Sequence, residues 1–168
     1  MIRDFDVVVA GSGAGGLVGA LRAAEHGLRV VVLEKAEFCG GTTALSGAGL
    51  WAPANLHVLK AGQEDSLQLA QTYLDHTVGN RTPHTMQNAF LQAAAVTIAW
   101  LEEQSVRFSY MTGYPDYHPD EPGGLLSGRA ITPKAIKPAV MAGLEHRVQP
   151  KLPMGESARL TLRRPRPY

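Results

Sequence analysis

Two short apolar runs open the chain, with a glycine-rich turn and a helical pattern between them. Phe5–Ala10 and Leu28–Leu33 are rich in valine, which is typical of buried strands in a parallel sheet. The apolar residues of Leu17–Gly27 recur every three or four positions, and the final glycine suits a helix end. Strand, turn, helix and strand in about 30 residues predict a right-handed βαβ unit. The expected fold class is therefore α/β.

Helical spacing recurs twice further along the chain. Asp65–Gly79 carries apolar residues every three or four positions, and Asp65 or Ser66 suits its N-cap. Thr85–Gln104 predicts a longer helix. The apolar face of that second helix is expected to contain Met86, Phe90, Ala93, Thr97, Trp100 and Leu101.

The other segments before the tail have little regular pattern. Cys39–Trp51 is rich in glycine and hydroxyl side chains, which indicates a functional loop with room for a short helical start. Val106–Tyr110 predicts a short strand. The glycine and proline density of Thr112–Pro133 indicates loops and turns.

Composition excludes several classes of protein. A net charge of +1 over 168 residues gives no overall electrostatic case for nucleic acid as a partner. The single cysteine, Cys39, excludes an internal disulfide framework, and the six histidines have no metal-ligand spacing, so no metal site is expected. No apolar run approaches about 20 residues, so no transmembrane segment is expected. The N-terminus has no secretory pattern, and the cytoplasm is the expected location.

Charge divides the chain at Pro133. Residues 1–133 contain 8 basic and 13 acidic side chains, whereas residues 134–168 contain 8 basic and 2 acidic ones. We therefore predict one domain over 1–133 and an unassigned, irregular, Arg/Pro-rich tail over 134–168, in which Ala139–Val148 is the only candidate helix. An early stop or a change of reading frame is one hypothesis for the abrupt switch, and translation of the downstream DNA in all frames tests it.

The turn after the first strand matches G-x-G-x-x-G in a βαβ context. The first glycine permits the tight turn, the second lets the backbone approach a diphosphate, and the third allows close packing of helix on strand. The helix start offers free N–H groups to the phosphates. Glu34 ends the second strand, where a carboxylate accepts hydrogen bonds from an unphosphorylated ribose, so FAD or NAD is expected. The candidate diphosphate-binding residues are Gly11, Ser12, Gly13, Ala14, Gly15 and Gly16.

The next segment resembles the flavoprotein family of 3-ketosteroid dehydrogenases and fumarate reductases. The resemblance is carried by Glu34-Lys35 and by the run from Gly40 to Gly47 (GGTTALSG). The steroid branch is favoured by GAGLWAP at Gly47–Pro53, by Tyr73-Leu74, by GYPDYHP at Gly113–Pro119, and by Gly123-Gly124 with Gly128-Arg129. This resemblance implies a Rossmann-like FAD-binding fold, of which this chain is an incomplete, N-terminal part. The FAD-binding residues that it implies are Glu34, Lys35, Gly40, Gly41, Thr42, Thr43, Ala44, Ser46 and Gly47.

The resemblance also implies an activity, the 1,2-desaturation of a 3-ketosteroid. A tyrosinate takes the proton from C2, and a hydride passes from C1 to the flavin. Tyr117 occupies the position of an active-site tyrosine, and this match outweighs the turn aromatic that the sequence without the resemblance favours. Residues 38–50 contain no histidine, so the FAD is expected to be non-covalent. The sequence departs from the family pattern at Cys39, Leu45 and His118, where aromatic residues are usual.

Two other functions stay open. A fumarate-reductase-like enzyme would need several cationic side chains around a dicarboxylate, and this chain offers little beyond Arg129 and His118. A non-catalytic remnant that binds part of FAD, or nothing, is the second. In the resembling family a later segment completes the FAD domain, so the two predicted strands lack neighbours and could pair with another chain.

Overall fold

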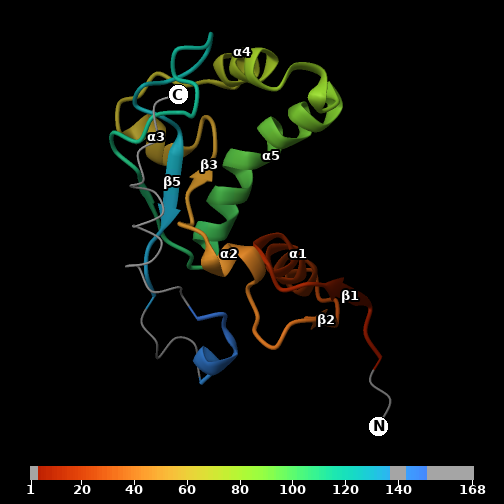
Figure 1. Ribbon diagram of the computed structural model, residues 1–168. Helices are drawn as coiled ribbons and strands as arrows, with labels where there is room; N and C mark the ends of the chain where they lie inside the picture. The colour runs from red at the N-terminus through yellow and green to blue at the C-terminus, as the bar shows by residue number, and fades with distance from the viewer. Residues whose placement is uncertain (1–3, 137–142, 151–168) are drawn as a thin grey trace, which may run out of the picture. The chain divides into compact units, whose positions relative to one another are not determined.

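The computed structural model describes residues 4–136 and 143–150, which belong to two compact units (Figure 1). Unit 1 consists of residues 1–47 and 136–168, and unit 2 consists of residues 48–135.

Unit 1 contains the predicted βαβ motif, drawn in red to orange in Figure 1. Strand β1 (Val7–Ala10) pairs in parallel with β2 (Val30–Leu33), in a register that places Val7 opposite Val30. Helix α1 (Ala14–Glu25) connects the two strands and contacts both. Gly27 has φ of 79° just after the helix, and its N–H donates to the Ala24 carbonyl at 2.9 Å. The predicted α/β class and the glycine helix end are confirmed.

Two further pieces complete the described part of unit 1. Helix α2 (Gly41–Leu45) is the short helical start expected within the glycine-rich loop. A 3-10 turn, η3 (Glu145–Arg147), precedes Val148, which forms a parallel bridge with Cys39. The Cys39 N–H donates to the Arg147 carbonyl at 2.6 Å. Of the helix predicted over residues 139–148, residues 139–142 lie outside the described residues. In the described remainder, only the 3-10 turn is helical.

Unit 2 is built on a three-stranded antiparallel sheet in the order β3-β5-β4. The strands are β3 (Leu50–Trp51), β4 (Phe108–Tyr110) and β5 (Ala130–Pro133). The prediction of a strand ending at Tyr110 is confirmed, but β3 and β5 lie in segments predicted as loops. Because both strands are short and are flanked by glycine-rich loops, the sequence shows no alternation of apolar and polar residues there. The two strands pair with each other although they lie about 80 positions apart in the chain.

The helices of unit 2 are α3 (Leu56–Lys60), α4 (Leu67–Thr77) and α5 (His84–Glu103), with a 3-10 turn, η1 (Gly79–Arg81), between the last two. The N-cap predicted for α4 is Ser66, whose Oγ accepts from the Leu69 N–H at 3.1 Å. Helix α3 was not predicted. Its N-cap is the buried Asn55, whose Oδ1 accepts from the His57 and Val58 N–H groups.

The apolar face predicted for α5 is wrong at its N-terminal half. The buried residues are Gln87, Leu91 and Ile98, whereas Met86 is 63 % exposed and Phe90 is 44 % exposed. Gln87 enters the buried face because its Nε2 donates to the carbonyls of Gly79 and Thr82. The buried face of α5 is therefore shifted by one position from the predicted apolar face, because Gln87 finds backbone partners there.

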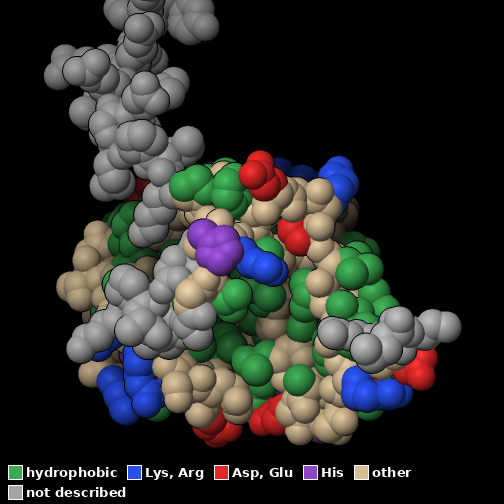
Figure 2. Space-filling model, turned by 90° about the horizontal axis from the view of Figure 1, so that it is seen from below, with side chains coloured by type: hydrophobic (Ala, Val, Ile, Leu, Met, Phe, Trp, Pro, Cys, Tyr) green, Lys and Arg blue, Asp and Glu red, His purple; other side chains and the backbone are tan. Residues whose placement is uncertain are grey.

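The hydrophobic core of unit 2 lies between the sheet and α5. It consists of Ala52, Ile98, Phe108 and Ile131, with Ala94, Leu101 and Val106 packed against it. Many other large hydrophobic side chains are exposed, among them Val8 on β1 and Leu33 on β2. Figure 2 likewise shows hydrophobic side chains in green over the viewed face. Exposed valine and leucine on a two-stranded parallel sheet agree with the expectation that these strands lack neighbours.

Candidate functional site

The glycine turn between β1 and α1 requires glycine at its first and last positions. Gly11 has φ of 97°, a conformation that other residues rarely adopt. A Cβ added at Gly16 would lie 2.2 Å from the Gly11 carbonyl oxygen, so a side chain there would force the turn apart. By contrast, a Cβ at Gly11 or Gly15 would meet no atom within 4 Å, so the turn leaves space beside its backbone.

The N-terminus of α1 is open to an anion. Its N-cap is Gly13, which has no side chain to cap the first N–H groups. The first backbone bond of the helix runs from the Leu17 N–H to the Gly13 carbonyl, so the N–H groups of Ala14, Gly15 and Gly16 have no partner within the helix. Thr43 Oγ1 accepts from the Ala14 N–H, which leaves those of Gly15 and Gly16 for an anion. A diphosphate fits this end of the helix by charge and by hydrogen bonding.

Glu34 follows β2 and binds the glycine turn. Its Oε2 accepts from the Ser12 N–H at 2.9 Å and from the Ser12 Oγ at 2.5 Å, and its Oε1 accepts from the Ala36 N–H at 2.9 Å. These donors lower the pKa of Glu34 from 4.5 to about 2, the Ala36 N–H most strongly and the two Ser12 donors next. Glu34 is thus held ionised beside the turn, with lone pairs left for a ribose hydroxyl.

The double-glycine segment is tied to the same turn. The Gly40 N–H donates to the Ser12 Oγ at 2.9 Å, and the Ala14 N–H donates to the Thr43 Oγ1 at 3.2 Å. Gly40 has φ of 111° and is the N-cap of α2. A Cβ at Gly40 would lie 2.7 Å from the Ala44 Cβ, so glycine is required there too.

Unit 1 therefore brings together Ser12, Ala14, Glu34, Gly40 and Thr43 from among the predicted cofactor-binding residues. The others take less part in this network. Ser46 bonds within its own segment, its Oγ donating to the Thr43 carbonyl at 2.8 Å. Among the other predicted cofactor-binding residues from Lys35 to Gly47, Ala44 is half-buried and five are exposed, namely Lys35, Gly41, Thr42, Ser46 and Gly47. The open helix end, the ionised carboxylate and the glycine-lined turn together fit a dinucleotide such as FAD.

Unit 2 contains a buried ion cluster that the sequence did not reveal. Arg129 is 0 % exposed and pairs with two carboxylates, Asp65 through Nε at 2.8 Å and Asp116 through Nη1. Its Nη2 donates to the Gly123 carbonyl at 2.8 Å. Asp116 also accepts from the N–H groups of Leu125 and Arg129. Each nitrogen of the Arg129 guanidinium thus has a partner inside the protein.

Aromatic side chains enclose this cluster. The guanidinium of Arg129 lies 5.5 Å from the Trp51 ring centre and 5.7 Å from that of Tyr73. The Trp51 Nε1 donates to Asp116 at 2.8 Å, and the indole stacks on Phe90 with ring centres 5.9 Å apart. Arg129 and Trp51 thus contact each other through a cation–π interaction, and both bind Asp116, the residue before Tyr117.

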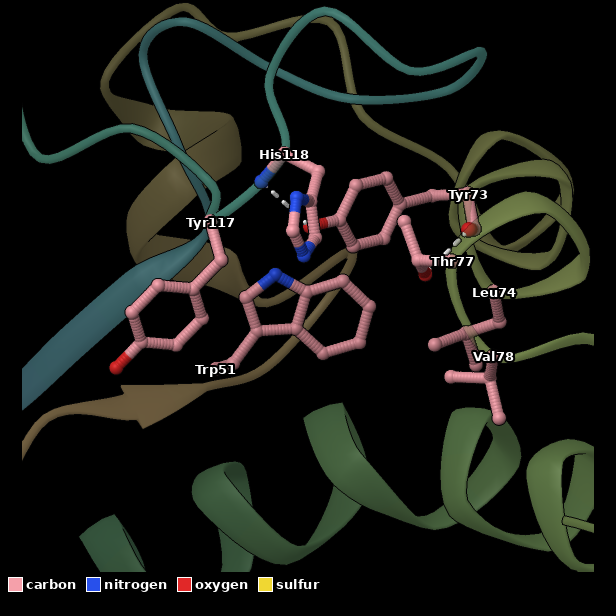
Figure 3. Close-up of a pocket in the computed structure, with 7 residues that line it drawn as sticks. All are labelled: Trp51, Tyr73, Leu74, Thr77, Val78, Tyr117 and His118. Carbon is pink, nitrogen blue, oxygen red and sulfur yellow. Dashed lines mark hydrogen bonds between the residues drawn. The ribbon is translucent and has the colours of Figure 1, made fainter. Parts of the chain in front are cut away.

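Tyr117 lies at a pocket of about 300 Å³ in unit 2 (Figure 3). The pocket is lined by Trp51, Tyr73, Leu74, Thr77, Val78, Tyr117 and His118. Tyr117 is 86 % exposed, and its hydroxyl is directed away from the Trp51 indole. The His118 N–H donates to the Tyr73 hydroxyl at 3.1 Å, which fixes the chain just after Tyr117. A largely apolar pocket with one exposed phenol at its rim could receive a flat apolar molecule.

Within residues 4–136 and 143–150, no cluster of three or more potential metal-binding side chains occurs. No helix in the described part of the chain combines the length and apolarity needed to cross a membrane. His118 and Leu45 are both exposed, and Cys39 is a free, half-buried cysteine.

Comparison with known proteins agrees with the geometry of unit 1. A 3-oxosteroid 1-dehydrogenase of Mycobacterium tuberculosis (strain ATCC 25618 / H37Rv) is 42 % identical over 149 residues, which are 86 % of this chain and 26 % of that protein. A 4-oxocyclohexanecarboxylate 2-dehydrogenase of Sinomonas cyclohexanicum is 41 % identical over 140 residues, 83 % of this chain and 24 % of that protein.

A solved structure is also similar. It is 3-ketosteroid Δ1-dehydrogenase from Sterolibacterium denitrificans in complex with 1,4-androstadiene-3,17-dione, with a TM-score of 0.81 and 31 % identity. The match covers 88 % of this chain and 26 % of that one. The chain thus spans about a quarter of the length of these relatives.

The family described as FAD binding domain matches residues 6–159, and so extends past Pro133, where the resemblance seen in the motifs ends. The predicted resemblance to 3-ketosteroid dehydrogenases is confirmed. Between NAD and FAD, which the glycine motif left open, the comparisons favour FAD. The chain belongs to the FAD binding domain family, and its cofactor is FAD.

Proposed function

We propose that this chain forms the N-terminal FAD-binding part of an oxidoreductase that introduces a double bond beside the carbonyl of a cyclic ketone, as 3-ketosteroid 1-dehydrogenases do. The observation that carries the substrate side is Tyr117, an exposed phenol at the rim of an aromatic pocket. The relatives that support this reaction include both a steroid dehydrogenase and a dehydrogenase of a single-ring ketone. We infer a 3-ketosteroid as the substrate, because the similar solved structure contains a steroid dienedione.

The proposed cofactor contacts follow from unit 1. The open N-terminus of α1 would hold the diphosphate, and Glu34 would accept hydrogen bonds from the ribose. The segment from Gly40 to Gly47 would lie against the flavin half, without a covalent bond. When bound, FAD supplies the two-electron acceptor of the reaction.

Tyr117 is the proposed proton acceptor for C2 of the ketone. Its exposure lets the phenol oxygen reach a substrate, and the pocket beside it offers apolar contact to a flat ring system. The backbone just before Tyr117 is fixed, because Arg129 and Trp51 both bind the side chain of Asp116. A base that is exposed at its oxygen and anchored at its backbone suits a proton transfer.

A fumarate-reductase-like function has less support. Such a site needs unpaired cationic donors for a dicarboxylate, and sequence offered Arg129 as one of them. Arg129 is fully buried, and its three guanidinium nitrogens bond to Asp65, Asp116 and Gly123 inside unit 2, so its charge is not presented to a substrate.

The proposal also covers the extent of the FAD-binding part, the pairing of its strands and the location of the protein. Residues 1–133 would be the main FAD-binding part, and the family match continues to residue 159, within the segment 134–168 to which the motifs assign no role. The exposed strands β1 and β2 would pair with a further chain or segment that completes the sheet. The cytoplasm is the proposed location, in keeping with the single cysteine.

A two-stage assay tests the proposal. The purified chain is mixed with FAD, desalted and examined for flavin absorbance, and then a 3-ketosteroid is added together with an artificial electron acceptor. The proposal expects bound flavin in this chain, and steroid-dependent reduction of the acceptor in an assembly that completes the enzyme. Flavin that stays bound while the steroid causes no reduction would limit the chain to cofactor binding, and protein without flavin would favour the non-catalytic remnant.

A further inference from the structure

Ser12 connects two separate parts of the FAD site in unit 1. Its side chain is buried, with the residue 2 % exposed. Its Oγ contacts the Gly40 N–H on one side and Glu34 Oε2 on the other. A backbone N–H can only donate, so the Oγ accepts from Gly40 and gives its own hydrogen to Glu34. The hydrogen bonds therefore run in one direction, from Gly40 through Ser12 to Glu34.

The Gly40 end of this chain of bonds sets the start of α2. Gly40 is the N-cap of that helix, in a backbone conformation that a side chain would strain. The helix meets the glycine turn a second time where Thr43 Oγ1 accepts from the Ala14 N–H. The segment from Gly40 to Thr43 is thus joined to the turn at two points, of which Ser12 is the one that also reaches Glu34.

We propose that Ser12 is a positioning residue for FAD. It couples the carboxylate of Glu34, which would bind the ribose, to the backbone at Gly40, so that these two regions of the site form together. The inference rests on the proposed cofactor contacts. Because Ser12 is buried, its hydroxyl acts through Glu34 and Gly40 rather than through contact with the cofactor. Consecutive hydrogen bonds of one direction polarise one another, which strengthens the coupling.

The binding test uses the full 168-residue chain and FAD itself. Ser12→Ala leaves the Gly40 N–H without its acceptor and Glu34 without one donor, and we expect its Kd for FAD to rise about tenfold. In a Glu34→Gln background the same change should have a clearly smaller effect, because the partner charge is gone. Ser109→Ala, which removes a hydroxyl in unit 2, is the matched control and should leave the Kd unchanged. Equal effects of Ser12→Ala in both backgrounds would overturn the coupling.

A second readout needs neither FAD nor a variant. In NMR spectra of the wild-type chain, the Gly40 amide proton should shift in step with protonation of the Glu34 carboxylate as the pH falls. A Gly40 amide that ignores the Glu34 titration would overturn the proposal, even if Ser12→Ala weakened FAD binding. If the wild-type chain binds no FAD, the proposed function fails, whereas the NMR titration still decides the role of Ser12.

Discussion

The Arg129 guanidinium lies 5.5 Å from the centre of the Trp51 ring, and both side chains bind the carboxylate of Asp116. Asp116 is therefore held from two directions, immediately before the exposed Tyr117. This arrangement explains how the largely exposed side chain of Tyr117 can have a fixed backbone. It also assigns Arg129 to the interior of unit 2 and not to a substrate.

Arg129→Met should destabilise unit 2 strongly. Removal of one partner from a buried ion pair leaves an uncompensated charge, and such changes typically cost about 3–5 kcal/mol of unfolding free energy. Here two carboxylates, Asp65 and Asp116, would lose their cation. Urea unfolding followed by the fluorescence of Trp51 and Trp100 measures the change.

Arg22→Met is the matched control for that experiment. Arg22 pairs with Glu25 on the exposed surface of α1, where an ion pair contributes little to stability. A small effect at Arg22 and a large one at Arg129 would support the buried cluster. Equal small effects would contradict the description of Arg129.

Two glycines of α1 should respond oppositely to alanine. In Gly16→Ala the new Cβ would lie 2.2 Å from the Gly11 carbonyl oxygen, so the turn must open and FAD binding should be lost. In Gly19→Ala the Cβ would meet no atom within 4 Å, and the helix should gain roughly 0.5–1 kcal/mol. FAD titration and thermal unfolding of both variants provide the measurement, and retained FAD binding in Gly16→Ala would refute the close packing of this turn.

Acid should destabilise the folded chain in part through Glu34. The pKa of Glu34 is lowered from 4.5 to about 2 in the folded state, chiefly by the Ala36 N–H and Ser12. A lowered pKa contributes stability that is complete above pH 4.5 and is lost as the pH falls toward 2. Asp6, whose pKa Arg29 lowers to about 2, adds to the same loss. Glu34→Gln should flatten the dependence of stability on pH in this window, and a Glu34 midpoint near 4.5 by NMR would contradict the network.

Tyr117→Phe should remove activity but not the fold. The change deletes only the exposed hydroxyl, so FAD affinity and melting temperature should stay as in the wild type. Loss of a general base typically lowers the rate by about 10²–10⁴. Steady-state reduction of an artificial acceptor, measured in an assembly that shows ketosteroid activity, tests this. Tyr114→Phe, at another exposed tyrosine of unit 2, is the control, and equal rates in both variants would exclude Tyr117 as the base.

The sequence predicted the elements that depend on local pattern. The valine-rich strands, the glycine turn, the end of α1 at Gly27 and the Ser66 N-cap all follow from residues close together in the chain. The same holds for Glu34, because the end of β2 fixes its place beside the turn. The structure adds that Ser12 donates to this carboxylate through both its N–H and its Oγ.

The elements that the sequence missed depend on distant partners. Strand β5 pairs with β3 and β4 across long separations, and Arg129 reaches Asp65 over 64 positions. Neither shows a period or a motif that reveals its partner. A faint signal existed for α3, because Asn55 before an apolar residue suits an N-cap. The α5 face was misplaced since Gln87 is buried through backbone hydrogen bonds that only the fold supplies.

FAD binding tests the central claim most directly. The 168-residue chain is incubated with excess FAD and desalted, and its visible spectrum is recorded beside that of Gly16→Ala. The account predicts that the wild-type chain retains flavin absorbance in near-equimolar amount and that the variant does not. A wild-type chain that emerges colourless, or a variant that holds flavin equally well, would contradict it.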